Sequence, residues 1–160
     1  MSQPNPNFVI VPMADHDIDE IMETAASQPH APSWTRAAYE VAIDARTCPK
    51  RVALVAKTAK DDHILGFIIA NLNAPDSELE TIVTAASHQR QGIAQKLFEA
   101  LLSELRSAGA TQITLEVRPS NHPAIALYKS LGFSQSGSRP RYYADPVEDA
   151  VLMVFRLSSM

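Results

Sequence analysis

The chain has 160 residues, of which 46% are apolar and 20% are charged, with a single cysteine. This length and apolar content are typical of a globular protein that buries its own core, so we expect one domain over residues 1–160. The apolar runs are too short to cross a bilayer, and the N-terminus lacks the basic and apolar regions of a secretory signal. Cys48 cannot form an internal disulfide. We therefore expect a cytoplasmic protein with no membrane partner.

Charge is distributed unevenly along the chain, whose formal net charge is -4. Residues 1–80 carry 6 basic and 12 acidic side chains, whereas residues 81–143 carry 7 basic and 3 acidic ones. A mildly basic segment in an acidic protein is suited to attract an anionic small ligand, although scatter among surface charges would give the same counts. No basic run is dense enough for nucleic-acid binding, so we expect no direct nucleic-acid partner.

The first half of the chain predicts strands and two short helices. The expected elements are a strand over 8–13, a helix over 18–25, a helix after Ser33, and strands over 51–57, 63–71 and 79–84. Ser33 is the expected N-cap of the second helix. The apolar positions expected on that helix are Trp34, Ala37, Ala38, Val41 and Ala42. The polar turn over 59–62 joins two of the strands and predicts an antiparallel hairpin.

The second half predicts a strand–helix–strand unit and a strand-rich tail. The expected elements are a long helix from 93 ended by Gly109, a strand over 113–117, a short helix between Asn121 and Gly132, Phe133 in a strand, a tyrosine-rich loop, and a last strand over 150–157. A strand–helix–strand unit favours a parallel pair with a right-handed crossover. Together with the antiparallel hairpin, it predicts a mixed-sheet α/β (α+β) fold class.

The turn Gln89–Ala94 is the first candidate site. It opens the long helix, and its Gly92 and Ala94 leave room for close backbone approach. A helix N-terminus offers free N–H groups to an anion, commonly a phosphate. The turn has neither the Gly-Lys-Ser/Thr of a Walker loop nor the three spaced glycines of a dinucleotide fingerprint. The alternative is a glycine that permits tight packing of strand on helix.

Glu116 and Tyr128 are the other two candidates. Strand alternation turns Glu116 away from the face of Ile113 and Val117, and an unpaired buried carboxylate is costly, so the side chain is either exposed or present for a purpose. An ion pair with Arg118 on the same strand is the structural alternative. For Tyr128, on the short helix, the alternative is core packing with a satisfied hydroxyl.

Taken together, these segments resemble the GNAT family of acyl-CoA-dependent N-acetyltransferases, whose pyrophosphate-binding motif matches Gln89-x-x-Gly92-x-Ala94. Within that family the chain is similar to the ribosomal-protein-alanine N-acetyltransferase branch. The residues that carry this similarity are Gln89-Arg90-Gln91-Gly92, Leu115-Glu116-Val117-Arg118, Ser120-Asn121, Ala124 to Phe133, Tyr142-Tyr143 and Glu148-Asp149-Ala150. The resemblance implies the GNAT fold, with a mixed central sheet of about six to seven strands and helices on both faces.

The resemblance also implies a role for each site residue, with acetyl-CoA as co-substrate and no metal. Backbone groups of one strand end would pair with the pantetheine arm, and amides of the turn would hold the pyrophosphate. Glu116 would be the general base and Tyr128 the general acid. The residues implied to bind acetyl-CoA are Ile82, Val83, Thr84, Gln89, Arg90, Gln91, Gly92, Ile93, Ala94, Gln95 and Asn121.

The acceptor that the resemblance suggests is a protein N-terminus, the alanine of small-subunit ribosomal protein eighteen. An α-amine, with a pKa of about 7.7–8.0, is easier to deprotonate than a lysine. A carboxylate can take the amine proton and a tyrosine can protonate the leaving thiolate, so no covalent enzyme intermediate is required. The alternatives are the same chemistry on another amine (a polyamine, an antibiotic, a free amino acid or a lysine side chain) and a non-catalytic acyl-CoA-binding module. Retention of both Glu116 and Tyr128 argues against the latter.

Overall fold

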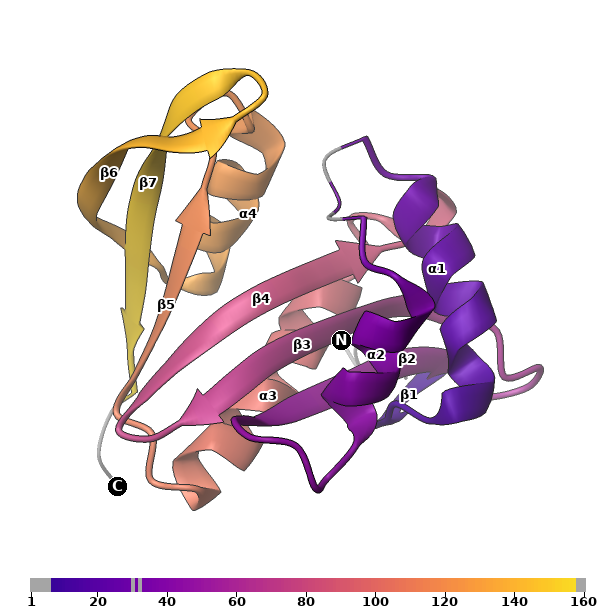
Figure 1. The fold of residues 1–160 in the computed structure, drawn as a ribbon. Helices are drawn as coiled ribbons and strands as arrows, with labels where there is room; N and C mark the ends of the chain where they lie inside the picture. The colour runs from indigo at the N-terminus through magenta and orange to yellow at the C-terminus, as the bar shows by residue number, and fades with distance from the viewer. Residues whose placement is uncertain (1–6, 30, 32, 158–160) are drawn as a thin grey trace, which may run out of the picture.

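The computed structural model describes residues 7–29, 31 and 33–157, which form one seven-stranded sheet with helices on both faces (Figure 1). The strands are β1 (Phe8–Pro12), β2 (Lys50–Thr58), β3 (Ile64–Asn73), β4 (Asp76–Thr84), β5 (Gln112–Val117), β6 (Ser134–Ala144) and β7 (Val147–Arg156). The helices are α1 (Ile18–Ala26), α2 (Arg36–Ile43), α3 (Ile93–Ser107) and α4 (His122–Leu131), with short 3-10 turns at Asp15–Asp17 and Ala86–His88. Residues 1–6, the start of the segment considered for a secretory signal, lie outside the described residues. Within the described ranges, no helix is long and apolar enough to cross a membrane.

The sheet has the order β1-β2-β3-β4-β5-β7-β6, and β4–β5 is its parallel pair. Every other neighbouring pair is antiparallel, including the hairpin of β2 and β3. The parallel pairing is short, because the register joins only Asp76 to Gln112, Ser77 to Ile113 and Glu78 to Thr114. Beyond it the two strands diverge, so that β5, β6, β7 and α4 stand apart from the rest of the sheet (Figure 1). The mixed-sheet fold class and its parallel pair are therefore confirmed.

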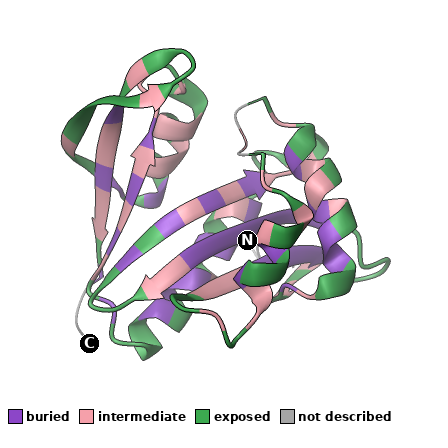
Figure 2. Cartoon of the chain, viewed as in Figure 1, coloured by how far each residue is buried: buried purple, intermediate pink, exposed green. Residues whose placement is uncertain are grey.

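Two hydrophobic clusters fix helices on opposite faces of the sheet. On one face, α3 presents the predicted apolar stripe, with Leu97, Phe98 and Leu105 almost fully buried, and α4 packs against the same cluster. On the other face, α1 and α2 cover β2 and β3 through a separate cluster that includes Tyr39 and Phe67. Buried residues accordingly run along the inner strands (Figure 2). Fully burying one such side chain contributes about 1.5–3 kcal/mol.

The start and the buried face of α2 differ from the prediction. Thr35, not Ser33, is the N-cap, since its hydroxyl accepts a hydrogen bond from the Ala38 N–H at 3.1 Å. Serine and threonine are both preferred N-cap residues, so the sequence alone did not separate two candidates two residues apart. The helix buries Tyr39 and Ala42, whereas Val41 is exposed. The predicted apolar face was therefore wrong by part of a turn.

The tail also departs from the prediction, because the expected tyrosine-rich loop is part of β6. Phe133 lies one residue before this strand. The pairing of β6 with β7 shifts register twice, and residues 140–142 lie opposite the single residue Asp149. Such bulges break the period-2 pattern on which strand prediction depends. The strand is mostly exposed, which weakens that pattern further.

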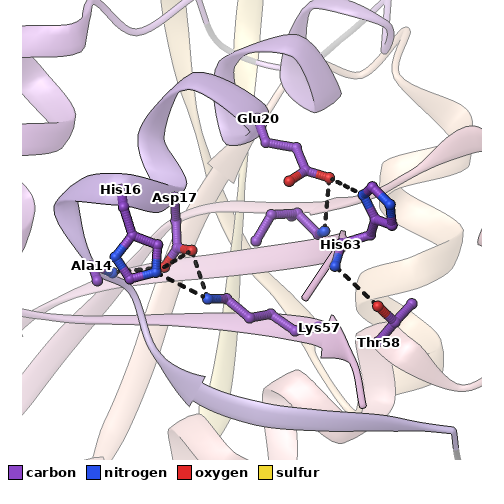
Figure 3. A network of polar contacts seen from close by, with 8 residues as sticks. Ala14, His16, Asp17, Glu20, Lys57, Thr58 and His63 are labelled. Carbon is purple, nitrogen blue, oxygen red and sulfur yellow. Dashed lines mark hydrogen bonds and ion pairs between the residues drawn. The ribbon is translucent and has the colours of Figure 1, made fainter. Parts of the chain in front are cut away.

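A buried ion pair ties the start of α1 to β2 (Figure 3). Lys57 Nζ lies 2.7 Å from Asp17 Oδ1, and the two residues are only 7% and 4% exposed. The second carboxylate oxygen of Asp17 accepts the Ala14 N–H at 2.9 Å. Glu20, one turn further along α1, accepts the Ile64 N–H at 2.9 Å. Because burying charges is favourable only when they are paired, these contacts hold α1 in one position over the sheet.

Candidate active site

The divergence of β4 from β5 leaves one edge of β4 open. After Glu78, β4 pairs with β3 on one side, and no strand among the described residues pairs with its other edge. Glu80 is an extra residue in the register with β3, since Ala70 faces Leu79 and Ile69 faces Thr81. This bulge reverses the alternation of the strand. The open edge includes Ile82, Val83 and Thr84, the residues predicted to pair with the pantetheine arm, and an open edge can accept an added extended chain.

The turn before α3 has the properties of an anion-binding helix start. Gly92 occupies the N-cap with φ +82°, and no side chain caps the helix. The first-turn N–H groups of Ile93, Ala94 and Gln95 have no hydrogen-bond partner among the described residues. Four such N–H groups begin every α-helix, and they favour a phosphate when left free. Gln89 and Arg90, which are exposed, complete the turn.

The position of this turn depends on close packing beneath it. Gly66 on β3 faces Thr84, and a Cβ at Gly66 would lie 2.6 Å from the Val83 carbonyl oxygen and 3.3 Å from Ile93 Cγ2. The first residue of α3 therefore rests directly on the end of the β3–β4 pair. Tight packing of strand on helix, the alternative explanation for Gly92, is found at Gly66 instead.

Two polar contacts connect the turn and α4 to their surroundings. Gln89 Nε2 donates to Gln28 Oε1 at 3.1 Å, which joins the anion-binding turn to the segment after α1. Asn121 caps α4, because its Oδ1 accepts the Ala124 N–H at 3.3 Å. The amide nitrogen of Asn121 has no partner among the described residues. The assignment of Asn121 to cofactor binding stays a prediction.

Glu116 lies on β5 beyond the point where β4 leaves it. Ile113, Leu115 and Val117 are buried in the α3 cluster, so Glu116 projects from the opposite face, as the alternation predicts. The carboxylate lies 3.3 Å from Arg139 Nη1. The hydrogen bond between Tyr142 and Glu116 is the main cause of the raised pKa of the Tyr142 hydroxyl.

The predicted alternative of an ion pair between Glu116 and Arg118 is wrong. Arg118 Nη1 lies 2.9 Å from Glu148 Oε2, and its guanidinium is 4.3 Å from the centre of the Tyr143 ring. It also donates to the Pro146 carbonyl at 2.8 Å. Successive even-numbered side chains of a strand share a face, but the partners across the β6–β7 hairpin decide which charges meet. The hydrogen bond from Arg118 holds the pKa of Glu148 below its ordinary value.

Tyr128 is half-buried on α4, with its ring 5.9 Å from the Phe133 ring. Burial, and secondarily the nearby Tyr143, raises the pKa of the Tyr128 hydroxyl to about 12. Tyr143 also interacts electrostatically with Glu116. Glu116 and Tyr128, the two candidate proton-transfer residues, therefore both lie near Tyr143, in the part of the molecule that diverges from β4.

Sequence reasoning missed a second group of charged residues on the face of Glu116. Arg51 Nε donates to Glu80 Oε2 at 2.7 Å at the base of an open pocket of about 510 Å³. The pocket is lined by Ser33, Trp34, Thr35, Ala37, Ala38, Val41, Arg51 and Glu80. Glu78 lies between this pocket and Glu116: burial first, then Glu116 and Glu80, raise the pKa of its carboxyl. The acidic first half of the chain was the available signal, but it did not identify positions.

Cys48 is exposed. No group of three or more His, Cys, Asp or Glu side chains in the described part of the chain could hold a metal ion.

Comparison with known proteins gives a consistent result. The Acetyltransferase (GNAT) family matches residues 16–133. The ribosomal protein bS18-alanine N-acetyltransferase of Salmonella typhimurium is 38% identical over 104 residues, which are 64% of this chain and 70% of that protein. The crystal structure of the ribosomal-protein-S18-alanine N-acetyltransferase from Escherichia coli has a TM-score of 0.78 at 28% identity, over 96% of both chains. A Salmonella typhimurium protein solved with its cofactor acetyl-CoA shares the fold, with a TM-score of 0.76 at 18% identity over 96% of both chains.

The two glycines that flank α3 provide a matched test of the anion-binding turn. Gly92 and Gly109 have φ of +82° and +89°, and a Cβ at either would meet no atom within 4 Å. Alanine at either position should therefore cost a similar amount of stability, about 1–2 kcal/mol, for the left-handed backbone. We expect Gly92→Ala to weaken coenzyme A binding measured by calorimetry at least fivefold and Gly109→Ala to leave it unchanged. Equal affinities in both variants would remove the turn from the cofactor site.

Proposed function

Since the chain belongs to the acetyltransferase (GNAT) family, we propose that it transfers the acetyl group of acetyl-CoA to the N-terminal α-amine of a protein. The proposed acceptor is the N-terminal alanine of ribosomal protein bS18, on which the named relatives act. The observation that carries the proposal is that Glu116 and Tyr128, the proposed base and acid, both lie beside the divergence of β4 and β5. There Glu116 projects from one face, and Tyr128 lies on the helix that packs on the other.

The residues present fit the cofactor in two places. The free N–H groups of Ile93, Ala94 and Gln95 suit the pyrophosphate. The open edge of β4 at Ile82–Thr84 suits the amide-containing arm, which would add to the sheet as an extended chain. Acetyl-CoA, when bound, supplies the thioester whose acetyl carbon the amine attacks.

In the proposed mechanism, Glu116 and Tyr128 move protons at opposite ends of the exchange. Glu116 takes a proton from the acceptor ammonium, directly or through water, which frees the nitrogen lone pair for attack. As the new C–N bond forms and the C–S bond breaks, the nitrogen releases its second proton to solvent. Tyr128 gives its hydroxyl proton to the departing sulfur. Because burial keeps the pKa of Tyr128 at about 12, the hydroxyl carries its proton at physiological pH and is available as an acid.

A peptide panel tests the acceptor class. An alanine-started hexapeptide should be acetylated at its N-terminus, whereas the same peptide with a blocked N-terminus and one internal lysine should react at least tenfold more slowly at pH 7. The lysine pKa of about 10.4 leaves far less free amine than the α-amine pKa of about 7.7–8.0. Mass spectrometry with acetyl-CoA locates the acetyl group. Faster reaction of the lysine peptide would move the enzyme to side-chain acetylation.

Glu116→Gln tests the base. Glutamine keeps the size and much of the hydrogen bonding but cannot accept a proton at neutral pH. We expect kcat/KM for the alanine-started peptide to fall about 10²–10⁴-fold at pH 7. Part of the loss should return above about pH 8, where more of the α-amine is already deprotonated. A variant equally impaired from pH 6.5 to 9.5 would make Glu116 a positioning residue.

Tyr128→Phe tests the acid, since phenylalanine keeps the ring that packs on Phe133 and removes the proton donor. We expect kcat to fall about 10²–10⁴-fold with little change in Tm. The raised pKa sets the sign of the pH dependence: the wild-type hydroxyl loses its proton only near pH 12, so kcat should show no loss from this group up to pH 10. Turnover within twofold of wild type in the variant would leave Tyr128 as a packing residue.

A further inference from the structure

Arg139 is the cation closest to the proposed base. Its Nη1 lies 3.3 Å from Glu116 Oε1, and the two side chains are 59% and 19% exposed. No other salt bridge reaches Glu116 among the described residues. An arginine with most of its surface in water is held weakly, because exposed ion pairs contribute little. The guanidinium can therefore leave the carboxylate at small cost.

The backbone that carries Arg139 is fixed, in contrast to its side chain. Arg139 faces Ala150 in the β6–β7 register, directly before the bulge at 140–142. The N–H of Arg141, which has φ +51°, donates to Asp149 Oδ1 at 2.9 Å across this bulge. The contacts of Arg118 with Glu148 and the β6–β7 turn tie the same hairpin to β5. Arg139 is thus presented to Glu116 by a hairpin that these contacts connect to β5.

The Arg139 guanidinium and an acceptor ammonium would form the same kind of ion pair with the Glu116 carboxylate. Each is a cation that donates N–H groups to a carboxylate oxygen, so the two compete for the lone pairs of Glu116 and repel one another there. We propose that Arg139 occupies the acceptor ammonium's place on Glu116 in the free enzyme and is displaced when the acceptor binds. Arg139 is then an internal competitor that sets acceptor affinity. This inference rests on the proposed function in one respect, that Glu116 receives a cationic amine.

Glu78 adds negative charge to the same face of the sheet as Glu116. Burial first, then the neighbouring Glu116 and Glu80, raise the pKa of its carboxyl, whereas Asn71 and Arg139 lower it. The other arginines of this face are already engaged, Arg51 with Glu80 and Arg118 with Glu148. Arg139 is therefore the arginine of this group whose ion pair is single and mostly exposed, and its guanidinium also lies 5.7 Å from the centre of the Tyr142 ring.

Three single variants and one double variant test the proposal against a general effect of positive charge. Arg139→Gln removes the competitor, so KM for the alanine-started peptide and the calorimetric Kd of alanine amide with coenzyme A bound should both fall about 2- to 5-fold. Arg139→Lys restores a cation and should return both values to within twofold of wild type. Arg141→Gln removes a charge two residues away whose side chain makes no ion pair among the described residues, and should leave both unchanged. In a Glu116→Gln background, Arg139→Gln should change the Kd less than twofold.

Several results would overturn the proposal. An unchanged or higher Kd in Arg139→Gln would make Arg139 a packing residue or a direct acceptor contact. An equal gain in acceptor affinity in Arg141→Gln would show that the effect comes from the overall positive charge of the surface and not from Arg139 itself. Failure of the proposed function would give a different result, because wild-type enzyme would then acetylate a lysine peptide or spermidine and not the alanine-started peptide. The same variant ratios, measured with that amine, decide the role of Arg139 in that case as well.

Discussion

The short pairing of β4 with β5 is the constraint on which the candidate site depends. Two parallel strands joined by a helix would ordinarily hydrogen-bond along their length, but here the register ends at Glu78 and Thr114. Every element of the site follows from that early end. The edge of β4 becomes open, α3 begins where β4 finishes, and Glu116 is left on a strand with no neighbour on the β4 side. Had the pairing continued, backbone bonds of β5 would occupy the edge that an extended ligand can use.

The charged residues around Glu116 differ mainly in how firmly they are held. Arg51 with Glu80 and Arg118 with Glu148 are partly buried pairs whose arginines make two or more hydrogen bonds. These pairs behave as parts of the scaffold. The contact of Arg139 with Glu116 is a single, longer one made by an exposed side chain. One face of the sheet therefore combines two partly buried ion pairs with one that is mostly exposed, at Glu116, the proposed base.

Local patterns in the sequence were sufficient for most elements and for the residues whose roles are local. Gly92 before a helix, Asn121 at an N-cap and Glu116 opposite an apolar strand face all follow from the spacing of neighbouring residues, and the structure places each as expected. Within the site, the failures involve distant partners. Arg139 is 23 positions from Glu116, and only the β6–β7 register brings them together. The bulge at Glu80 and the irregular β6 have no sequence signature, because an extra residue is visible only when two strands are aligned.

Gly66 shows that the geometry of the turn proposed to bind phosphate is set partly by a residue outside that turn. Any side chain at this position would have to displace either the Val83 carbonyl or Ile93, the first residue of α3. The size of the side chain at position 66 therefore determines how closely the start of α3 can approach the end of β4. Substitution there would misalign the amides of α3 with the open strand edge while leaving the binding motif itself intact. Sequence variation is thus limited at position 66, which lies outside the binding motif. A substitution in the core there would lower cofactor affinity even though the surface proposed to bind the cofactor is unchanged.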